Sequence, residues 1–326
     1  MILSILVSAL LVIVSGKLIL PMLTRLKFGQ SEREEGPKSH LVKAGTPTMG
    51  GLMMIVGVLA STLILGSDSL VFALPSVLVF VACAIIGFVD DFVKIKITKK
   101  GLRAYQKIIA QFLVGIVVAI YCYKTLGSTI ELPFSNAELN LGWFYIPFAL
   151  IVVIAAVNSV NLIDGLDGLS SGVTLIYSVA MGVIFIYLTQ IKDSLGFVME
   201  SEGMRGMVIF CGAIAGACLG FLRYNSYPAK VFMGDTGSLA LGGAVAMMAL
   251  CSRAVLLLPI MGGCYVATSI SVILQVGSFK LTGKRIFKMA PLHHHFELMK
   301  IKETKIVSGY MIVTVLLCLI SLLAYT

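Results

Sequence analysis

Apolar runs of about 20 residues recur from one end of this 326-residue chain to the other, and they limit the fold more than any other feature of the sequence. A helix of that length crosses the ~30 Å hydrocarbon core of a bilayer and satisfies its own backbone hydrogen bonds there. We place ten runs, at residues 2–23, 49–66, 70–89, 107–126, 143–160, 170–189, 204–222, 238–250, 254–279 and 306–325. No segment between them is long enough for a separate soluble domain. The sequence therefore predicts an all-α integral membrane protein with ten transmembrane helices, in which residues 1–326 form a single polytopic domain.

The basic residues are distributed unequally between the two sides of the membrane. The connections after the first, third, fifth, seventh and ninth runs contain 20 of the 25 Lys and Arg residues. The opposite side has only Lys124, Lys192, Arg205 and Arg253. Because loops rich in Lys and Arg remain in the cytoplasm, this bias places both termini outside it and the basic loops inside.

The acidic residues that could do chemistry fall on the same cytoplasmic side, at Asp90, Asp91, Asp164, Asp167 and Asp235. Asp90 and Asp91 end the third run, where hydrocarbon gives way to headgroups. Two adjacent carboxylates repel each other and lose water there, so they need a cation or must share a proton. Lys94, one helical turn further on, or a divalent metal ion would relieve that cost. Two solvated aspartates at a helix end are the alternative, and the position of the other aspartates argues against it.

Three further cytoplasmic loops carry polar groups beside glycine. The loop with Lys43 and Thr48 is too rich in Gly and Pro to be a helix, and its amides could hold a phosphate, although a plain turn also explains it. The sequence NLIDGLDG, which begins at Asn161, suits a hard cation or a polar ligand but lacks the pattern of a calcium loop. In the next loop, Phe232 follows Asn225; its ring could stack on a nucleobase or pack at the membrane boundary.

The ninth run is longer than the bilayer requires. Its 26 residues would span about 39 Å as a straight helix, and they include Pro259 and Gly262. We expect a bend or a strong tilt there, which leaves a lipid-facing gap beside it. Outside the cell, we expect a small hairpin in residues 127–142 and a polar segment with a short surface helix in residues 190–205.

The cytoplasmic side also carries three consecutive histidines, at positions 293–295. Neighbouring residues on a helix point about 100° apart, so the three rings cannot share one ion, and phosphate contacts are favoured over a zinc site. Oxygen ligands without thiolates favour Mg2+ or Mn2+. Lysines clustered beside such an ion are typical of phosphoryl transfer. A site at the membrane surface indicates one lipid substrate and one soluble substrate.

Six motifs resemble those of one enzyme family, in order and through nearly the whole chain. They are GPKSH, KAGTPTMGG, FVDDFVK, NLIDGLDGLSSG, FMGDTGSLALGG and PLHHHFE. Together they resemble the phospho-N-acetylmuramoyl-pentapeptide transferases, a branch of the polyprenyl-phosphate N-acetylhexosamine-1-phosphate transferase superfamily. The Asp-Asp and DGxDG elements are shared across that superfamily, whereas KAGTPTMGG and PLHHHFE look specific to this branch.

The resemblance implies an enzyme of bacterial peptidoglycan synthesis, embedded in the lipid of the inner membrane with its active site facing the cytoplasm. It would transfer phospho-MurNAc-pentapeptide from UDP-MurNAc-pentapeptide to undecaprenyl phosphate, giving lipid I and UMP. Mg2+ is the implied cofactor, with Mn2+ as an alternative. A homodimer is implied, and nucleic acid is not among the implied partners.

The resemblance also implies roles for individual residues. Asp235 would be the metal ligand, with Asp90 and Asp91 beside the reacting phosphates as further candidate ligands. Asp164 and Asp167 would bind metal or the uridine moiety, and Phe232 would lie against uracil. The residues implied to hold phosphates and sugar are Lys43, Thr48, Lys94, Lys107, Asn161, Asn225, Gln275, His293, His294 and His295, the three histidines being counted among the catalytic residues.

For the reaction, we favour direct attack of a lipid phosphate oxygen on the β-phosphate of the UDP-sugar, with Asp90 accepting any proton. A two-step route through an aspartyl-phosphate is permitted equally by the residue types. Two other functions compete. One is a sister enzyme that uses UDP-GlcNAc with the same lipid. The other is an ion-coupled transporter, which would need carboxylates near the bilayer midplane rather than at one surface.

Overall fold

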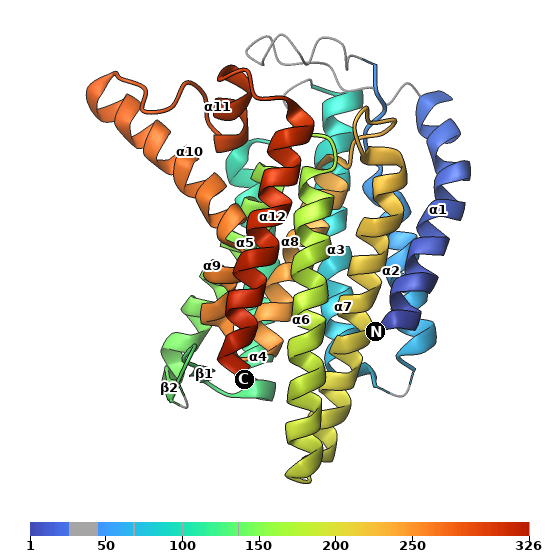
Figure 1. The fold of residues 1–326 in the computed structure, drawn as a ribbon, viewed down its shortest axis with the longest axis vertical. Helices are drawn as coiled ribbons and strands as arrows, with labels where there is room; N and C mark the ends of the chain where they lie inside the picture. The colour runs from blue at the N-terminus through green and yellow to red at the C-terminus, as the bar shows by residue number, and fades with distance from the viewer. Residues whose placement is uncertain (26–44, 68, 99–100, 136, 326) are drawn as a thin grey trace.

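The computed structural model describes residues 1–25, 45–67, 69–98, 101–135 and 137–325, and shows a bundle of long helices (Figure 1). The helices are α1 Ile2–Arg25, α2 Gly51–Leu65, α3 Leu70–Lys96, α4 Ala104–Leu126, α5 Tyr145–Ile163, α6 Leu169–Ser194, α7 Val198–Asn225, α8 Gly234–Cys251, α9 Leu258–Met261, α10 Gly263–Thr282, α11 Leu292–Leu298 and α12 Glu303–Leu322. The described part of the chain also contains the short 3-10 helices η2 Gly142–Phe144, η3 Val255–Leu257 and η4 Leu323–Tyr325.

Nine helices in the described residues are long and apolar enough to cross a membrane, so the chain is a multi-pass, all-α integral membrane protein. The helix α2 is a tenth apolar helix, but it has only 15 residues. It begins two residues later than predicted, after Met49, whose φ of +70° is not helical. Gly51 lies against the first turn of α8. A Cβ on Gly51 would lie 2.3 Å from the backbone nitrogen of Gly237.

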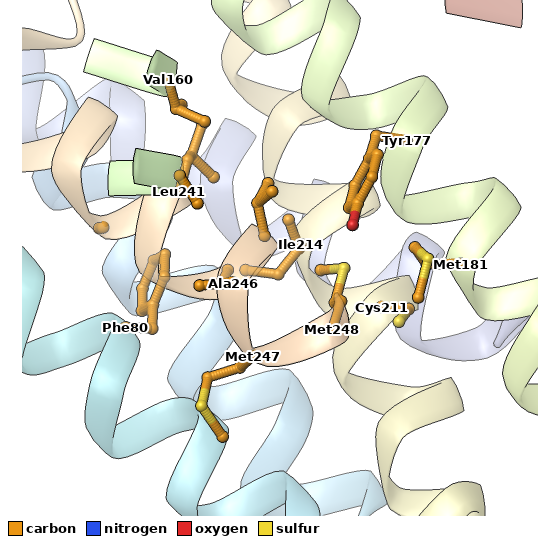
Figure 2. Packing of buried hydrophobic residues seen from close by; sticks show 14 of the residues in the cluster. Phe80, Val160, Tyr177, Met181, Cys211, Ile214, Leu241, Ala246, Met247 and Met248 are labelled. Atoms are coloured by element: carbon orange, nitrogen blue, oxygen red, sulfur yellow. The ribbon is translucent and has the colours of Figure 1, made fainter. Parts of the chain in front are cut away.

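Helix α8 lies at the centre of the bundle. Every residue of α8 from Thr236 to Cys251 is buried, and Figure 2 shows its side chains among those of the surrounding helices. Its glycines and alanines allow neighbouring backbones to approach closely. A Cβ on Gly242, for example, would lie 2.4 Å from the Cα of Val157 in α5. The same kind of close contact positions the candidate site described below.

We expected the ninth apolar run to bend or tilt strongly, and the structure interrupts it. It comprises η3, α9 and α10, with the break at Gly262, and α10 then projects away from the bundle (Figure 1). The buried residues of α10 all lie in its first half, from Cys264 to Ser271. Its second half therefore faces the surroundings instead of other helices.

Of the two segments that we expected outside the cell, only one forms as predicted. The predicted hairpin is present, with β1 Thr129–Glu131 paired antiparallel to β2 Glu138–Asn140. The prediction for residues 190–205 was wrong: no separate surface helix forms, because α6 and α7 simply continue through these polar residues to a tight turn. Ion pairs stabilise the two extensions, at 2.6 Å between Lys192 and Glu200 and 2.8 Å between Arg205 and Asp193.

Candidate active site

Three carboxylates from two helices meet at one end of the bundle. Asp90 and Asp91 lie near the end of α3, and Asp235 lies in the first turn of α8. One oxygen of each lies within 4.8 Å of the others. Among the described residues, this is the only such group of three or more His, Cys, Asp or Glu side chains. Residues separated by about 145 positions in the sequence are thus brought to one point.

A glycine on α3 allows this meeting. A Cβ on Gly87 would lie 2.0 Å from the backbone oxygen of Asp235, so only glycine lets the start of α8 lie directly against α3. Gly87 precedes Asp90 by about one helical turn, which puts both on the side of α3 that faces α8. The close backbone contact therefore fixes the position of Asp235 relative to the two aspartates.

Asp91 caps the start of α8. Its Oδ1 accepts a hydrogen bond from the backbone nitrogen of Asp235 at 3.1 Å, and its Oδ2 accepts from the backbone nitrogen and the hydroxyl of Thr236 at 2.9 and 2.7 Å. A carboxylate at this position satisfies amides that have no partner within the helix and interacts favourably with its dipole. The Thr236 hydroxyl was not predicted from the sequence, since no spacing rule relates it to Asp91.

Two lysines bind the other two carboxylates. Lys94 Nζ lies 2.5 Å from Asp90 Oδ2 and 3.0 Å from Asp235 Oδ2. Lys107 Nζ, from α4, lies 3.0 Å from the same oxygen of Asp235 and 3.4 Å from that of Asp90. The other oxygen of Asp90 accepts a hydrogen bond from the backbone nitrogen of Leu102 at 2.7 Å. Two ammonium groups thus face three carboxylates.

Asn161, at the end of α5, completes the contacts of Asp235. Its amide nitrogen donates to Asp235 Oδ1 at 3.0 Å and to the Ser238 hydroxyl at 2.8 Å. Side chains from α3, α4 and α5 therefore converge on Asp235. A donor set made of carboxylate oxygens, without sulfur or imidazole, fits a hard divalent cation such as Mg2+. The lysines show that the cluster already requires positive charge.

The loop after α5 approaches the same region. Burial raises the pKa of the Asp164 carboxyl to about 8, and the negative charges of Asp235 and Asp91 add to the shift. Asp167 is buried, and its Oδ2 accepts from the backbone nitrogen of Ala229 at 2.9 Å. Its own backbone nitrogen donates to Glu303 at 2.7 Å, a contact that no sequence motif indicated.

Two other predicted residues hold loops through their amides. Asn225 accepts from the backbone nitrogen of Gly168 at 3.1 Å and donates to the backbone oxygen of Val231 at 3.0 Å. Gln275, in α10, accepts from the backbone nitrogen of Phe287 at 2.9 Å and donates to its backbone oxygen at 3.0 Å. The side-chain amides of Asn225 and Gln275 therefore hold the backbone of neighbouring loops in position.

Thr48 lies close to the acidic cluster. It is buried, and a Cβ on Gly234 would lie 2.8 Å from its hydroxyl oxygen and 2.5 Å from Asp91 Oδ2. Gly234 also has a φ of +72°, which favours glycine. Phe232 is half-buried, and its backbone nitrogen donates to the oxygen of Pro47 at 2.8 Å. Lys43 lies outside the described residues.

The three histidines lie on the short helix α11 and contact different neighbours. His293 is buried against the loop after α5, where a Cβ on Gly165 would lie 2.2 Å from its Nε2. The Nδ1 of His294 lies 2.7 Å from Glu297, and the Nδ1 of His295 accepts from the backbone nitrogen of Lys288 at 3.1 Å. The three side chains therefore have different partners, although the rings of His293 and His294 pack edge to face with their centroids 4.3 Å apart.

Comparison with known proteins identifies the same family that the sequence motifs resemble. Residues 73–253, from α3 to just beyond α8, match the family model described as glycosyl transferase family 4. The chain is also similar to curated proteins named phospho-N-acetylmuramoyl-pentapeptide-transferase. The one from Clostridium perfringens (strain 13 / Type A) is 47% identical over 98% of this chain and 97% of the relative. Those from Clostridioides difficile (strain 630) and Caldanaerobacter subterraneus subsp. tengcongensis are 47% and 46% identical, over 98% and 97% of this chain and 96% of each relative.

Proposed function

Because the chain belongs to the phospho-N-acetylmuramoyl-pentapeptide-transferase family, we propose that it transfers phospho-MurNAc-pentapeptide from UDP-MurNAc-pentapeptide to undecaprenyl phosphate, giving lipid I and UMP. The observation that supports this most strongly is the cluster of Asp90, Asp91 and Asp235 beside Lys94 and Lys107. Both substrates carry phosphates, and the transfer needs positive charge and fixed positions more than covalent help from the protein.

In the proposed reaction, an oxygen of the lipid phosphate attacks the β-phosphorus of the UDP-sugar. A new phosphorus–oxygen bond forms, the bond to the UMP oxygen breaks, and UMP leaves. Lys94 and Lys107 neutralise phosphate charge, and Asp90 accepts any proton that the attacking phosphate carries. Little proton transfer is needed, since a phosphate monoester with a second pKa near 6 is mostly dianionic at pH 7.

We propose Mg2+, with Mn2+ as an alternative, as the cofactor of this cluster. Asp235 and Asp90 would hold it, and Asp91 would contribute while capping α8. When bound, the ion adds positive charge for the phosphate oxygens. The lysine contacts of Asp90 and Asp235 support the assignment, because they show where the carboxylates attract a cation.

The remaining residues have two kinds of proposed role. Thr48, Asn161, Asp164 and Phe232 would contact the UDP-sugar, as would Lys43 and the histidines of α11. Asp167, Asn225 and Gln275 would act mainly by positioning the loops around the substrate, because their polar groups already bind backbone.

We propose that the polyprenyl chain binds beside the broken ninth span. An apolar cavity of about 230 Å³ lies there, lined by α5, α8, η3, α9 and α10. Ser159 of α5 lines the cavity, and two residues further on Asn161 donates to Asp235. The cavity therefore extends along α5 to nearly the level of Asn161, so the phosphate of a chain bound there would lie at the same end of the bundle as the acidic cluster.

The proposed topology follows the distribution of basic residues. Counting α2 and the broken ninth span, the chain would cross the bacterial inner membrane ten times as one domain, with both termini outside and the acidic cluster facing the cytoplasm. The protein would act as a homodimer in the lipid bilayer.

Release of UMP by purified protein tests the function. We expect release to require both UDP-MurNAc-pentapeptide and undecaprenyl phosphate, to stop on removal of Mg2+ and to fail with UDP-GlcNAc. Asp235→Asn should lower it on the order of a thousandfold, whereas Asp193→Asn, in an exposed ion pair of α6, should leave it unchanged. Undiminished release by the Asp235 variant would remove this residue from the reaction.

The order of the chemical steps is a separate question. Direct attack predicts inversion at the transferred phosphorus. Radiolabel trapped on the protein in the absence of lipid acceptor would instead support an aspartyl-phosphate.

A further inference from the structure

We propose that the hairpin β1–β2 and Arg253 form a clamp that sets the distance between the two walls of the apolar cavity and thereby the affinity for the lipid acceptor. The inference rests on the proposed function, because the cavity is assigned there to the polyprenyl chain. The hairpin lies at the end of the bundle opposite α11 (Figure 1).

One wall of the cavity is attached to the hairpin through the chain itself. Strand β2 leads through η2 into α5, which contributes Phe148 and Ile151 to the cavity. The Asn140 side chain fixes this junction, since its Oδ1 accepts from the Ser128 hydroxyl at 2.7 Å and from the backbone nitrogen of Gly142 at 2.9 Å. The start of α5 therefore moves with the hairpin.

The other wall is attached to the hairpin by Arg253, which lies between α8 and η3. Its backbone oxygen accepts from the Glu131 nitrogen at 3.0 Å, its Nε donates to the Thr129 oxygen at 3.2 Å, and its Nη2 lies 3.7 Å from Glu138. The next segment, η3 and α9, supplies Leu256, Leu258 and Pro259 to the cavity. Arg253 thus connects both strands to the second wall.

The backbone conformation of Arg253 indicates that its side-chain contacts stabilise the turn. Its φ is +60°, in the left-handed region that glycine adopts at no steric cost and other residues adopt at some cost. If the turn required only this backbone conformation, glycine would adopt it without the steric cost. The side-chain contacts with Thr129 and Glu138 offset that cost, and they are the contacts that connect the two walls.

The clamp lies far from the acidic cluster. Asn161 lies 16 residues beyond Tyr145, the first residue of α5, which corresponds to a helix length of about 24 Å. The clamp therefore cannot contact either phosphate. Between the two lies the cavity, so loosening the clamp should affect the lipid chain and leave the UDP-sugar unaffected.

The first test measures both Michaelis constants in Arg253→Ala. We expect the KM for undecaprenyl phosphate to rise about tenfold, with the KM for UDP-MurNAc-pentapeptide unchanged and kcat within about twofold. Arg253→Lys, which keeps a donor and a charge, should restore part of the affinity. Arg205→Ala is the matched control: it also removes an outer arginine from an ion pair, but on α6–α7, and should change neither constant.

The second test uses the single tryptophan of the chain, Trp143 in η2, at the junction of hairpin and α5. A polyprenyl phosphate analogue brominated near the end of its chain should quench Trp143 fluorescence in the wild type. Quenching should require about tenfold more analogue in Arg253→Ala. If Arg253→Ala proves unstable, Arg253→Gly removes the same contacts while relieving the backbone strain, and should show the same shift.

An equal loss of affinity for both substrates, or an unchanged lipid KM in a folded Arg253→Ala or Arg253→Gly protein, would show that Arg253 is only a structural brace and would overturn the proposal. Either result in a protein that releases UMP leaves the proposed function intact. Absence of lipid-dependent UMP release from the wild type would instead contradict the proposed function and, because the clamp proposal rests on it, that proposal too.

Discussion

Helices α8 and α10 are similar in length, with 18 and 20 residues, yet they are packed in opposite ways. From Thr236 onward α8 is buried on every side, whereas the second half of α10 has no buried residue. The acidic cluster lies at the start of α8, and the apolar cavity lies beside the start of α10. The groups proposed for chemistry are thus held where the helices pack most closely. The surface proposed for lipid lies where packing is sparse and a long chain can enter from the membrane.

Equivalent substitutions in the two regions should therefore have very different effects, and the largest difference is expected at glycine. In Gly87→Val the new side chain would collide with the backbone of Asp235, so α8 must move and activity should fall more than about a thousandfold. In Gly277→Val of α10 no atom lies within 4 Å of the new Cβ, and activity should stay within about twofold. UMP release would measure the activity of both variants, with thermal unfolding as a check that each is folded. Equal losses of activity would contradict the expected difference between α8 and α10.

A lysine pair offers the next largest contrast. Lys107→Gln removes an ammonium that contacts Asp235 and Asp90, and should lower kcat on the order of a hundredfold. Lys284→Gln, an exposed residue just after α10, removes the same charge without such contacts and should change kcat little. Steady-state kinetics at saturating concentrations of both substrates would measure kcat for the two variants. A comparable fall in both variants would mean that the basic loops act through general attraction of anions.

A smaller effect is expected from the cap of α8. Thr236→Val keeps the shape of the side chain but removes one of three donors to Asp91, and should lower kcat about tenfold. Thr282→Val, at the exposed end of α10, is the control. Full activity in Thr236→Val would mean that the two backbone donors suffice to hold Asp91.

The smallest effect is expected where α10 anchors a loop. Gln275→Leu removes the hydrogen bonds to the backbone of residues 286 and 287, and should raise the KM for UDP-MurNAc-pentapeptide about three- to fivefold while kcat stays nearly constant. Gln190→Leu, an exposed residue near the outer end of α6, should change neither constant. A strong loss of kcat in Gln275→Leu would instead place this amide against the substrate.

Some features of the site followed directly from residue type and local spacing. The pairing of Lys94 with Asp90 follows from their positions one turn apart on a helix, and the different partners of His294 and His295 follow from the same geometry. The hairpin and the break in the ninth run followed from local alternation and from Pro and Gly. The surface helix in residues 190–205 was predicted wrongly, because polarity alone does not reveal that ion pairs extend two helices beyond the membrane.

The order of residues alone was enough to predict that the chain crosses a membrane many times and that its carboxylates lie beside cations, because hydrocarbon accepts only long apolar helices and isolated charges are too costly near it. Which groups meet depends instead on how the helices pack together. The contact of Gly87 with Asp235, the capping of α8 by Asp91 and the bonds from Arg253 to the hairpin all join residues more than 100 positions apart. No local pattern encodes such contacts, because they depend on how closely two helices can approach, and that distance is set by packing throughout the bundle.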